Sequence, residues 1–459
     1  MNAVLTKYNS NNRVAMGLFN VLADVQETEV EEDIWLTDAE IKRIEKSGIA
    51  LLEELKKNVK TILRETTIFR TVIFLCAVVF YGCKELPPAE AFDPSNSRLH
   101  VVWSKPFYAD SSQVVVLAPI VADRYVAVVG RSYSKLEDRM VVFDKSNGER
   151  HSAWQNGVKC ETNNTVNSLL VGGNNNDILF CATNKSLHAF SIPTGQSLWT
   201  AVYENYGYPT LFGSSILAAS LVNNICYADR YNAATGQKTN LFSFTNEYIY
   251  TIEWAVERND TLLFFLGGRN AYCYNLTRDS IVWKNTTLYD NGDNYTAFHP
   301  VIVENKYVLF QYEAAVGCLN FLTGELIWRQ NTQSAYSCPI LYCDGKVVVR
   351  PSSGNVSCYD VHNGNLLWKN TDLELLNDKD LNMDIYKGNI YLVTRRGTTY
   401  DCPGFLHCLS LTTGVVNWFD PGPDKGIYEN LTIDQQTGYL YCHSRQSVMC
   451  IDLTKTPTK

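Results

Sequence analysis

The chain repeats one short pattern of apolar and polar residues. In "GCLNFLTGELIW", residues 317–328, two apolar stretches flank a Thr-Gly corner, and a tryptophan follows four residues after the glycine. Close copies end at Trp199, Trp283, Trp368 and Trp418, which gives a period of roughly 40 to 50 residues. A repeat of this length is typical of one supersecondary unit that buries its apolar face only by stacking on its neighbours.

Three looser copies bring the total to eight. In "RMVVFDKSNGERHSAW" the tryptophan, Trp154, comes two places late. In the third copy, "DRYNAATGQKTNLFSF", Asn240 holds the place of the tryptophan, and Phe242 and Phe244 are the candidates to replace it. The last copy, "SVMCIDLTKT", reaches the end of the chain before its tryptophan.

A second apolar stretch precedes nearly every copy. Examples are "YVAVVG", "TLLFFLGG", "YVLFQY" and "IYLVTRRG", which are rich in β-branched and aromatic residues and follow turn-forming residues. Each unit is therefore predicted to be a small antiparallel sheet.

The glycine of the corner has a conformational explanation. A tight connection between antiparallel strands needs a positive φ, which glycine tolerates and β-branched residues do not. Asp279 takes this place in the fourth copy and Thr456 in the last, so those turns are expected to be less regular. The six turn glycines are Gly148, Gly195, Gly236, Gly324, Gly364 and Gly414.

The tryptophans suit docking between adjacent sheets, with each indole N–H on a backbone carbonyl. The seven candidates for this structural role are Trp103, Trp154, Trp199, Trp283, Trp328, Trp368 and Trp418. Eight units of this length predict an all-β fold, an eight-bladed β-propeller of four-stranded antiparallel blades. The strand around Trp103 has no repeat before it and the last copy lacks its closing strand, so the two are expected to complete one blade and leave no open sheet edge.

The repeat phrase, of the form Ala-x-Asp-x-x-Thr-Gly-x-x-x-Trp, resembles the tryptophan-docking repeat of the pyrroloquinoline-quinone (PQQ) propeller family. That family includes quinoprotein dehydrogenases, which hold PQQ and calcium in a central funnel. It also includes cofactor-free propellers such as the lipoprotein subunit of the outer-membrane β-barrel assembly machinery. The dehydrogenases typically carry adjacent cysteines, and no two of the 14 cysteines here are neighbours. The resemblance therefore favours the cofactor-free branch, with no catalytic, cofactor-binding or metal-binding residue.

Most cysteines have a packing explanation. Five of them share one column of the repeat in which other copies have Val142 or Ala189, so the column accepts small apolar residues. Arg230 interrupts it in the third copy. Cys402 with Cys408, and Cys442 with His443, are alternative candidates for a disulfide or metal ligands, although their spacing matches no standard zinc site. The five are Cys273, Cys318, Cys358, Cys408 and Cys450.

Charge argues against nucleic acid as a partner. The net charge is −8, and no cluster of basic residues is interleaved with aromatic ones. Some of the 27 tyrosines are candidates for a protein-binding face on the loops.

The segment before the propeller is "RTVIFLCAVVFYGCKELPP". Its apolar run is short for a membrane span and is typical of a secretory signal. Because it ends at Gly-Cys, it resembles a bacterial lipoprotein signal with Cys83 as the acylated residue. An uncleaved signal anchor and a buried or interfacial helix are the alternatives. Each of the first two interpretations puts the propeller outside the cytoplasm.

Residues 1–67 precede this segment and carry a helical pattern of apolar residues with a capping box at Thr37 and Glu40. Either the true start lies downstream, for example near Val59, or the leader is real and stays in the cytoplasm. The predicted organisation is a short helical N-terminal region at 1–67, a signal or anchor segment at 68–83, a linker at 84–99 and the propeller at 100–459.

The function predicted from these features is a non-catalytic, membrane-tethered scaffold in the cell envelope. It would bind protein partners through the propeller loops and the membrane through residues 68–83 or a lipidated Cys83, with no nucleic-acid partner. A PQQ-dependent dehydrogenase, a propeller that binds sugar or another small ligand, and a sensor that reports inward through its N-terminal helices are the alternatives.

Overall fold

The computed structural model describes residues 97–456 except for short segments between strands. These segments are 108–112, 116, 133–136, 163–165, 174, 204–207, 246–248, 268–269, 287, 289–299, 313–314, 332–338, 352–354, 374–381, 396–403, 424–425 and 445–446. All described residues belong to one compact unit, Phe92–Lys459. The predicted helical region, the segment 68–83 with Cys83, and most of the linker lie outside the described residues.

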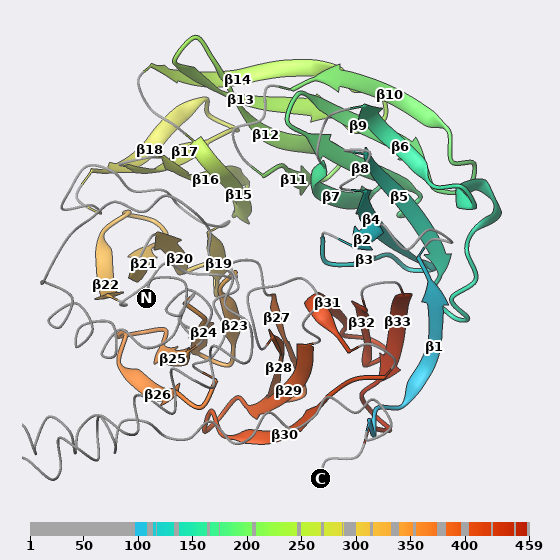
Figure 1. Cartoon of the computed structure of the whole chain (residues 1–459). Helices are drawn as coiled ribbons and strands as arrows, with labels where there is room; N and C mark the ends of the chain where they lie inside the picture. Colours follow the sequence, from blue (N-terminus) through green and yellow to red (C-terminus); the bar gives the residue numbers. More distant parts are fainter. Residues whose placement is uncertain are drawn as a thin grey trace, which may run out of the picture. The chain divides into compact units, whose positions relative to one another are not determined.

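Eight four-stranded antiparallel sheets form a closed ring, which confirms the predicted eight-bladed propeller (Figure 1). In blade 1 the inner strand is split into β2 and β3, which both pair with β4. The first four blades are β2 (Gln113–Val115), β3 (Ile120–Val121), β4 (Tyr125–Ser132), β5 (Glu137–Asp144) and β6 (Val158–Thr162); β7 (Val166–Gly172), β8 (Ile178–Thr183), β9 (Ser186–Ser191) and β10 (Ser197–Val202); β11 (Thr210–Phe212), β12 (Ser215–Val222), β13 (Ile225–Asn232) and β14 (Lys238–Thr245); and β15 (Ile249–Glu257), β16 (Asp260–Gly267), β17 (Ala271–Asn275) and β18 (Ser280–Asn285).

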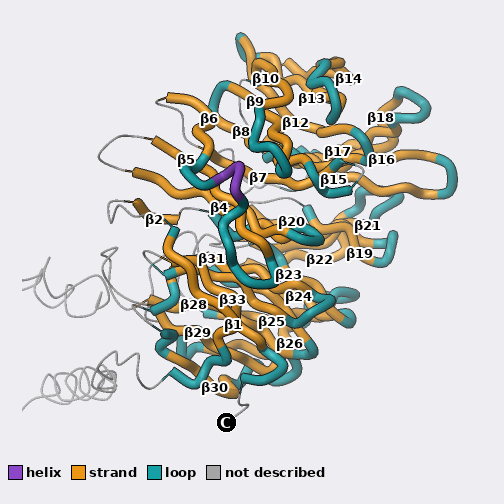
Figure 2. Tube along the Cα trace, turned by 90° about the vertical axis from the view of Figure 1, so that its right-hand side faces the viewer, coloured by secondary structure: helices purple, strands orange, loops and turns teal. Residues whose placement is uncertain are grey.

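The second half of the ring repeats the same order from the inner to the outer strand. Blades 5 to 7 are β19 (Val301–Val303), β20 (Tyr307–Tyr312), β21 (Ala315–Asn320) and β22 (Leu326–Asn331); β23 (Leu341–Cys343), β24 (Lys346–Val349), β25 (Val356–Asp360) and β26 (Leu366–Asn370); and β27 (Met383–Tyr386), β28 (Asn389–Arg395), β29 (Gly404–Ser410) and β30 (Val416–Asp420). Apart from the 3-10 helix η2 (Ser152–Trp154), the described residues form strands and connecting loops (Figure 2).

Blade 8 joins the two ends of the ring. Its inner strands are β31 (Tyr428–Asp434), β32 (Tyr439–His443) and β33 (Ser447–Asp452), and its outer strand is β1 (Val101–Pro106) from the start of the propeller. Trp103 pairs with Cys450 in this sheet. The incomplete last copy is therefore completed by the strand around Trp103, as its sequence predicts.

Polar contacts reinforce this junction. The Nζ of Lys145 in blade 1 lies 2.8 Å from Oδ2 of Asp434 in blade 8. The backbone N–H of Asp452 donates to the carbonyl of His100 at 2.9 Å, and the N–H of Arg98 donates to Asp420 Oδ2 at 2.7 Å. The ring is thus closed by backbone pairing, by an ion pair and by hydrogen bonds near both ends of the described propeller.

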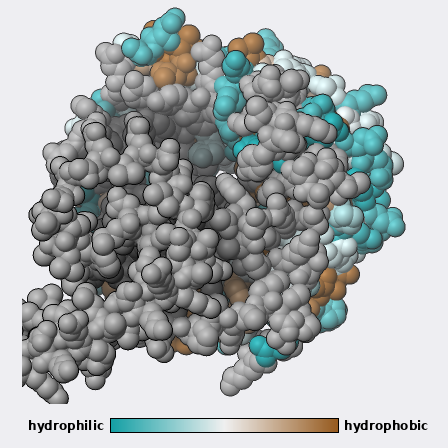
Figure 3. Space-filling view, in the orientation of Figure 1, coloured by the Kyte–Doolittle hydropathy of each residue, from teal (hydrophilic) through white to brown (hydrophobic). Residues whose placement is uncertain are grey.

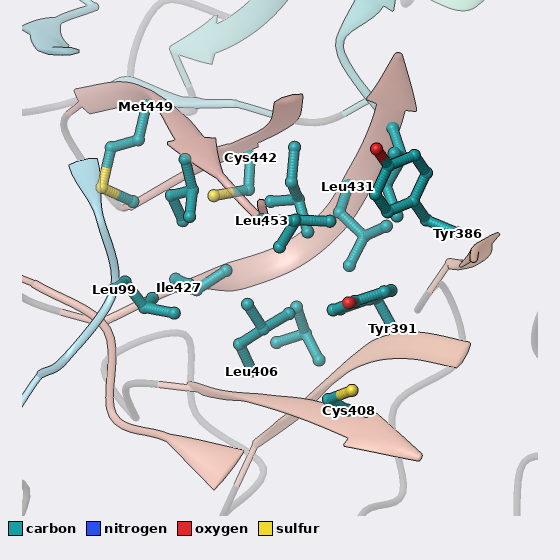
Figure 4. Packing of buried hydrophobic residues seen from close by; sticks show 14 of the residues in the cluster. Leu99, Tyr386, Tyr391, Leu406, Cys408, Ile427, Leu431, Cys442, Met449 and Leu453 are labelled. Atoms are coloured by element: carbon teal, nitrogen blue, oxygen red, sulfur yellow. The ribbon is translucent and has the colours of Figure 1, made fainter. Parts of the chain in front are cut away.

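The core is divided among the interfaces between blades. The buried apolar residues form eight clusters, and each cluster joins two neighbouring blades. Figure 4 shows the cluster between blades 7 and 8, where Leu406 and Tyr391 face Leu431 and Ile427. Each sheet is therefore apolar on both faces and is covered only because it has a blade on each side.

The third blade explains the two irregularities of its repeat. Phe242 pairs with Ala228, as the tryptophans of the other blades except Trp154 pair with the small residue of their own column. The docking pair of this blade lies two residues farther from the turn on each strand. Phe242 packs on Phe265 of blade 4 with ring centroids 5.0 Å apart. Ala228 therefore occupies the small-residue column, whereas Arg230 lies beyond it and donates to the hydroxyl of Ser215.

We predict that Trp103→Ala destabilises the closed ring, whereas truncation of an exposed side chain on another outer strand does not. The Trp103 side chain is 6 % exposed and its N–H donates to the Lys145 carbonyl at 3.1 Å. Loss of this packing is expected to lower the free energy of unfolding by about 3–5 kcal/mol, measured by urea unfolding. Leu198→Ala, at a side chain 49 % exposed, is the control and is expected to change it by less than about 0.5 kcal/mol. Equal effects would contradict this role for β1.

Candidate functional site

The repeated tryptophans link seven of the eight blades to the next, and Phe242 takes this place in blade 3. Trp328 at the outer edge of blade 5 is buried, and its Nε1 donates to the carbonyl of Val361 in blade 6 at 2.7 Å. Trp418 is also buried and lies edge-on to Tyr391, with ring centroids 6.1 Å apart. The other indole N–H groups donate to equivalent carbonyls: Trp103 to Lys145, Trp154 to Ile192, Trp199 to Ala233, Trp283 to Phe321 and Trp368 to Leu411.

Five of the six turn glycines receive these indoles, whereas a Cβ on Gly195 would meet the backbone carbonyl of Ala153. Their φ angles are 69° at Gly148, 68° at Gly195, 70° at Gly236, 71° at Gly324, 71° at Gly364 and 70° at Gly414. A Cβ on Gly324 would overlap the ring of Trp283, and a Cβ on Gly364 would overlap the ring of Trp328. Glycine is therefore required for the close approach of the indole as well as for the left-handed conformation.

The two copies without glycine keep part of this geometry. Asp279 adopts a φ of 53°, and its carboxylate accepts a hydrogen bond from the hydroxyl of Tyr274. Thr456 donates its N–H to the Asp452 carbonyl at 3.1 Å, as the glycines do in their own turns. The outgoing strand of that last turn is supplied by β1.

A β-bulge precedes the docking residue in the outer strand of blades 2 to 8. In blade 5, Trp328 pairs with Cys318 and Leu326 pairs with Leu319, so Ile327 is the extra residue. A bulge re-aims the side chains that flank it. Here the tryptophan points toward the next blade, while the residue before it faces outward. The equivalent register shifts lie at Leu198, Leu241, Val282, Leu367, Asn417 and Val102.

Two tryptophans depart from the simple pattern. Trp154 lies on η2, which brings its fully buried ring back to the next blade despite the late position. Trp254 lies outside the repeat phrase, on the inner strand β15, and donates to the carbonyl of Leu211 in blade 3. The repeat could not reveal Trp254, and its only sequence signal is a tryptophan in an apolar strand stretch.

The cysteine column is part of the core. The thiols of Cys273, Cys318, Cys358, Cys408 and Cys450 are free and buried. Burial raises the pKa of Cys273, Cys318, Cys358 and Cys450 to about 12. These groups are neutral and unreactive at neutral pH. Cys181 differs from them because it is disulfide-bonded.

Of the alternative disulfide and ligand candidates, the structure describes Cys408, Cys442 and His443. Cys408 and Cys442 are free thiols, and His443 is fully buried, whereas Cys402 lies outside the described residues. Within the described ranges, no group of three or more His, Cys, Asp or Glu side chains is placed to hold a metal ion. No helix among the described residues is long and apolar enough to cross a membrane.

The described surface mixes polar and apolar side chains. On the face drawn in Figure 3, hydrophobic residues form separate groups near the edge of the molecule, between hydrophilic ones. The exposed large apolar side chains are concentrated on outer strands and their turns, such as Leu326, Leu366 and Val415. The rim of the ring is thus the described surface where apolar contacts are available.

Gly324→Ala is predicted to destabilise the ring more than Gly345→Ala. Both glycines have a positive φ, 71° and 73°, so alanine costs about 1–2 kcal/mol at each. Only at Gly324 does the new methyl group meet an indole, because the space around Gly345 is open. Displacing Trp283 is expected to cost about 1–3 kcal/mol more. Urea unfolding of the two variants measures the difference, and equal losses would contradict tight docking at this turn.

The buried thiols predict a loss of stability at alkaline pH. Their ordinary pKa is 9.0, and in the folded chain the pKa of Cys318 is about 12. Below about pH 9 the thiol is protonated in both states. Between about pH 9 and 12 only the unfolded chain releases the proton, so the free energy of unfolding falls by about 1.4 kcal/mol per pH unit for each thiol.

Urea unfolding of wild type and Cys318→Val over this alkaline range tests the prediction. Valine stands in the same column at Val142, so the variant is expected to fold and to show a smaller pH slope. An identical slope in both proteins would show that Cys318 does not titrate on unfolding.

Comparisons with known proteins fit this geometry. Residues 229–456 match the protein-family model described as outer membrane protein assembly factor BamB. The structure is similar to BamB from Moraxella catarrhalis, with a TM-score of 0.55 and 13 % identity over 77 % of this chain and 100 % of that chain. Comparison with curated protein sequences finds no match.

Other solved propellers are similar to a comparable degree. Sqt1 from Chaetomium thermophilum, solved bound to the N-terminus of the ribosomal protein L10, has a TM-score of 0.55 and 10 % identity over 77 % of this chain and 99 % of that chain. A europium-containing methanol dehydrogenase has a TM-score of 0.51 and 12 % identity over 76 % of this chain and 86 % of that chain. At such identities these likenesses concern the fold alone. With the partial family match and the eight blades, seven docked by a tryptophan and blade 3 by Phe242, they support a PQQ-like repeat β-propeller fold similar to that of BamB.

Proposed function

We propose that this protein is a non-catalytic scaffold that presents a rigid propeller to protein partners in the cell envelope. The observation that carries the proposal is the match of residues 229–456 to the BamB family, on a ring whose repeated tryptophans are engaged in packing between blades. BamB is by its description an assembly factor, and Sqt1 was solved with a peptide segment of another protein. Both support protein binding over catalysis.

Rigidity is what this structure offers to a partner. Each blade is fixed to the next by a buried cluster and a docked aromatic ring, and the ion pair between Lys145 and Asp434 spans the closure. Outer strands and described turns held by such a frame lose little conformational entropy on binding, so a larger share of the contact energy remains for affinity. The described rim can therefore act as a preformed binding surface.

We also propose that the propeller is exported and tethered to the membrane. The support comes from the apolar segment 68–83 ending at Cys83, and from the disulfide at Cys181, because disulfides persist mainly in oxidising compartments. An acylated Cys83 would hold the ring next to the membrane through the linker 84–99.

Intact mass spectrometry of the protein from its native host tests the tether. We expect the mass of residues 83–459 plus acyl chains, and we expect the acyl mass to disappear in Cys83→Ser. A mass that corresponds to the full chain in both samples would rule out acylation and leave an uncleaved anchor or an internal helix as the role of residues 68–83.

The non-catalytic assignment is tested separately with purified protein, PQQ and calcium. We expect no dye reduction with primary alcohols and no quinone absorbance after gel filtration. Stoichiometric quinone retention together with alcohol-dependent turnover would overturn the scaffold assignment and favour a quinoprotein dehydrogenase.

A further inference from the structure

The outer strands of blades 4, 5 and 6 share a surface feature that the other blades lack. In each of them two exposed aliphatic residues stand directly before the docked tryptophan. These six side chains, which we call the rim belt, are 39–54 % exposed. The rim belt consists of Ile281, Val282, Leu326, Ile327, Leu366 and Leu367.

A basic residue follows the tryptophan in the same three strands. These residues are Lys284, Arg329 and Lys369, two of them exposed and Arg329 half-buried. Lys284 lies over the ring of Tyr272, and Arg329 donates to the carbonyl of Leu288. A row of positive charge therefore runs beside the apolar row.

The repeat provides an internal comparison for this feature. The residue after the docking aromatic is Thr200 in blade 2, Ser243 in blade 3, Phe419 in blade 7 and Ser104 in blade 8. The bulge position, whose side chain faces outward, is occupied by Asn417 in blade 7. Docking on the next blade thus needs neither the aliphatic pair nor the cation, so packing alone does not account for their recurrence in three consecutive blades.

The three segments lie next to each other around the ring (Figure 1). Trp283 docks on the turn of blade 5 through the Phe321 carbonyl, and the adjacent Leu322 is 58 % exposed. Trp328 docks in the same way on the turn of blade 6. The rim belt is therefore one surface that crosses three blades.

The chemistry of the rim belt fits an anionic lipid surface. Aliphatic side chains beside Lys and Arg are the combination by which peripheral proteins enter the headgroup region. Protein hot spots are instead enriched in exposed Trp and Tyr set in pockets, and the tryptophans here are turned inward. The carboxylates on the turn side, Asp279 and Glu325, accept hydrogen bonds from Tyr274 and Thr323 within their own blades.

We infer that the rim belt docks the propeller edge-on against a membrane that carries anionic phospholipid. The inference deepens the proposed tethering, because a ring tethered through the segment 68–83 and the linker 84–99 would gain a defined orientation from this contact. The partner is the lipid surface itself, with the aliphatic pairs in the interface and the cations on phosphate groups.

Hydroxyl-radical footprinting of the full chain, produced with Cys83→Ser so that no acyl chain is present, tests this inference. Vesicles of phosphatidylethanolamine with phosphatidylglycerol are expected to protect Leu326, Ile327, Leu366 and Leu367 from oxidation. Vesicles of phosphatidylcholine alone are expected to protect them much less. Leu198, the exposed bulge residue of blade 2, is the matched position and should stay equally reactive.

Variants separate the contributions of the two rows. Lys284→Gln and Lys369→Gln are each expected to raise the lipid concentration for half-maximal protection about fivefold. Leu326→Ser with Ile327→Ser should abolish protection of blade 5, whereas Leu198→Ser should leave the footprint unchanged. Circular dichroism confirms that each variant keeps the strand content of the wild type.

Two outcomes would overturn the inference. If vesicles that carry the chain, as shown by flotation, leave the rim belt fully reactive, the membrane is not its partner, although tethering by residues 68–83 stands. If protection appears only with envelope proteins in detergent, the rim belt binds a protein instead. Absence of the acyl mass at Cys83 would refute the acylated tether without changing the footprint.

Discussion

Everything in this structure depends on sheets that are apolar on both faces. A four-stranded sheet of this kind exposes on each side the valine, leucine and cysteine side chains that must leave water, so it is stable only between two others. Stacking in a line would leave two apolar ends, whereas a ring leaves none. The eight clusters between blades, and the completion of blade 8 by β1, are the physical solution to that constraint.

Much of this architecture could be predicted from the sequence because the repeat contains the residues that make each turn and each contact between blades. The repeated glycine predicts a left-handed turn, and the repeated tryptophan predicts an indole that packs on that turn. The unpaired strand around Trp103 predicts how the propeller closes. The third blade was harder to interpret. Its docking pair lies two residues farther from the turn on each strand, a shift that spacing from Gly236 cannot reveal, so the equivalence of Phe242 with the tryptophans and of Ala228 with the cysteines depends on strand pairing.

The candidate surface was less accessible to sequence reasoning. Two consecutive apolar residues such as Leu366 and Leu367, directly before a tryptophan, look like part of a buried strand in the sequence. Only the bulge shows that both side chains of the pair face outward. Trp254 illustrates the same limit, since its hydrogen bond to Leu211 joins inner strands through a contact that no repeat position encodes.

Closure by the first strand also sets an order of events for the polypeptide. As the chain emerges from its amino-terminal end, blades 1 to 7 can pair their own strands locally, but β1 has no partner until residues 447–452 of β33 have been made. The nascent propeller is therefore an open arc whose two terminal faces lack their neighbours for the whole of its synthesis. During that interval the uncovered apolar faces favour aggregation, and pairing of β1 with β33 is the step that closes the ring.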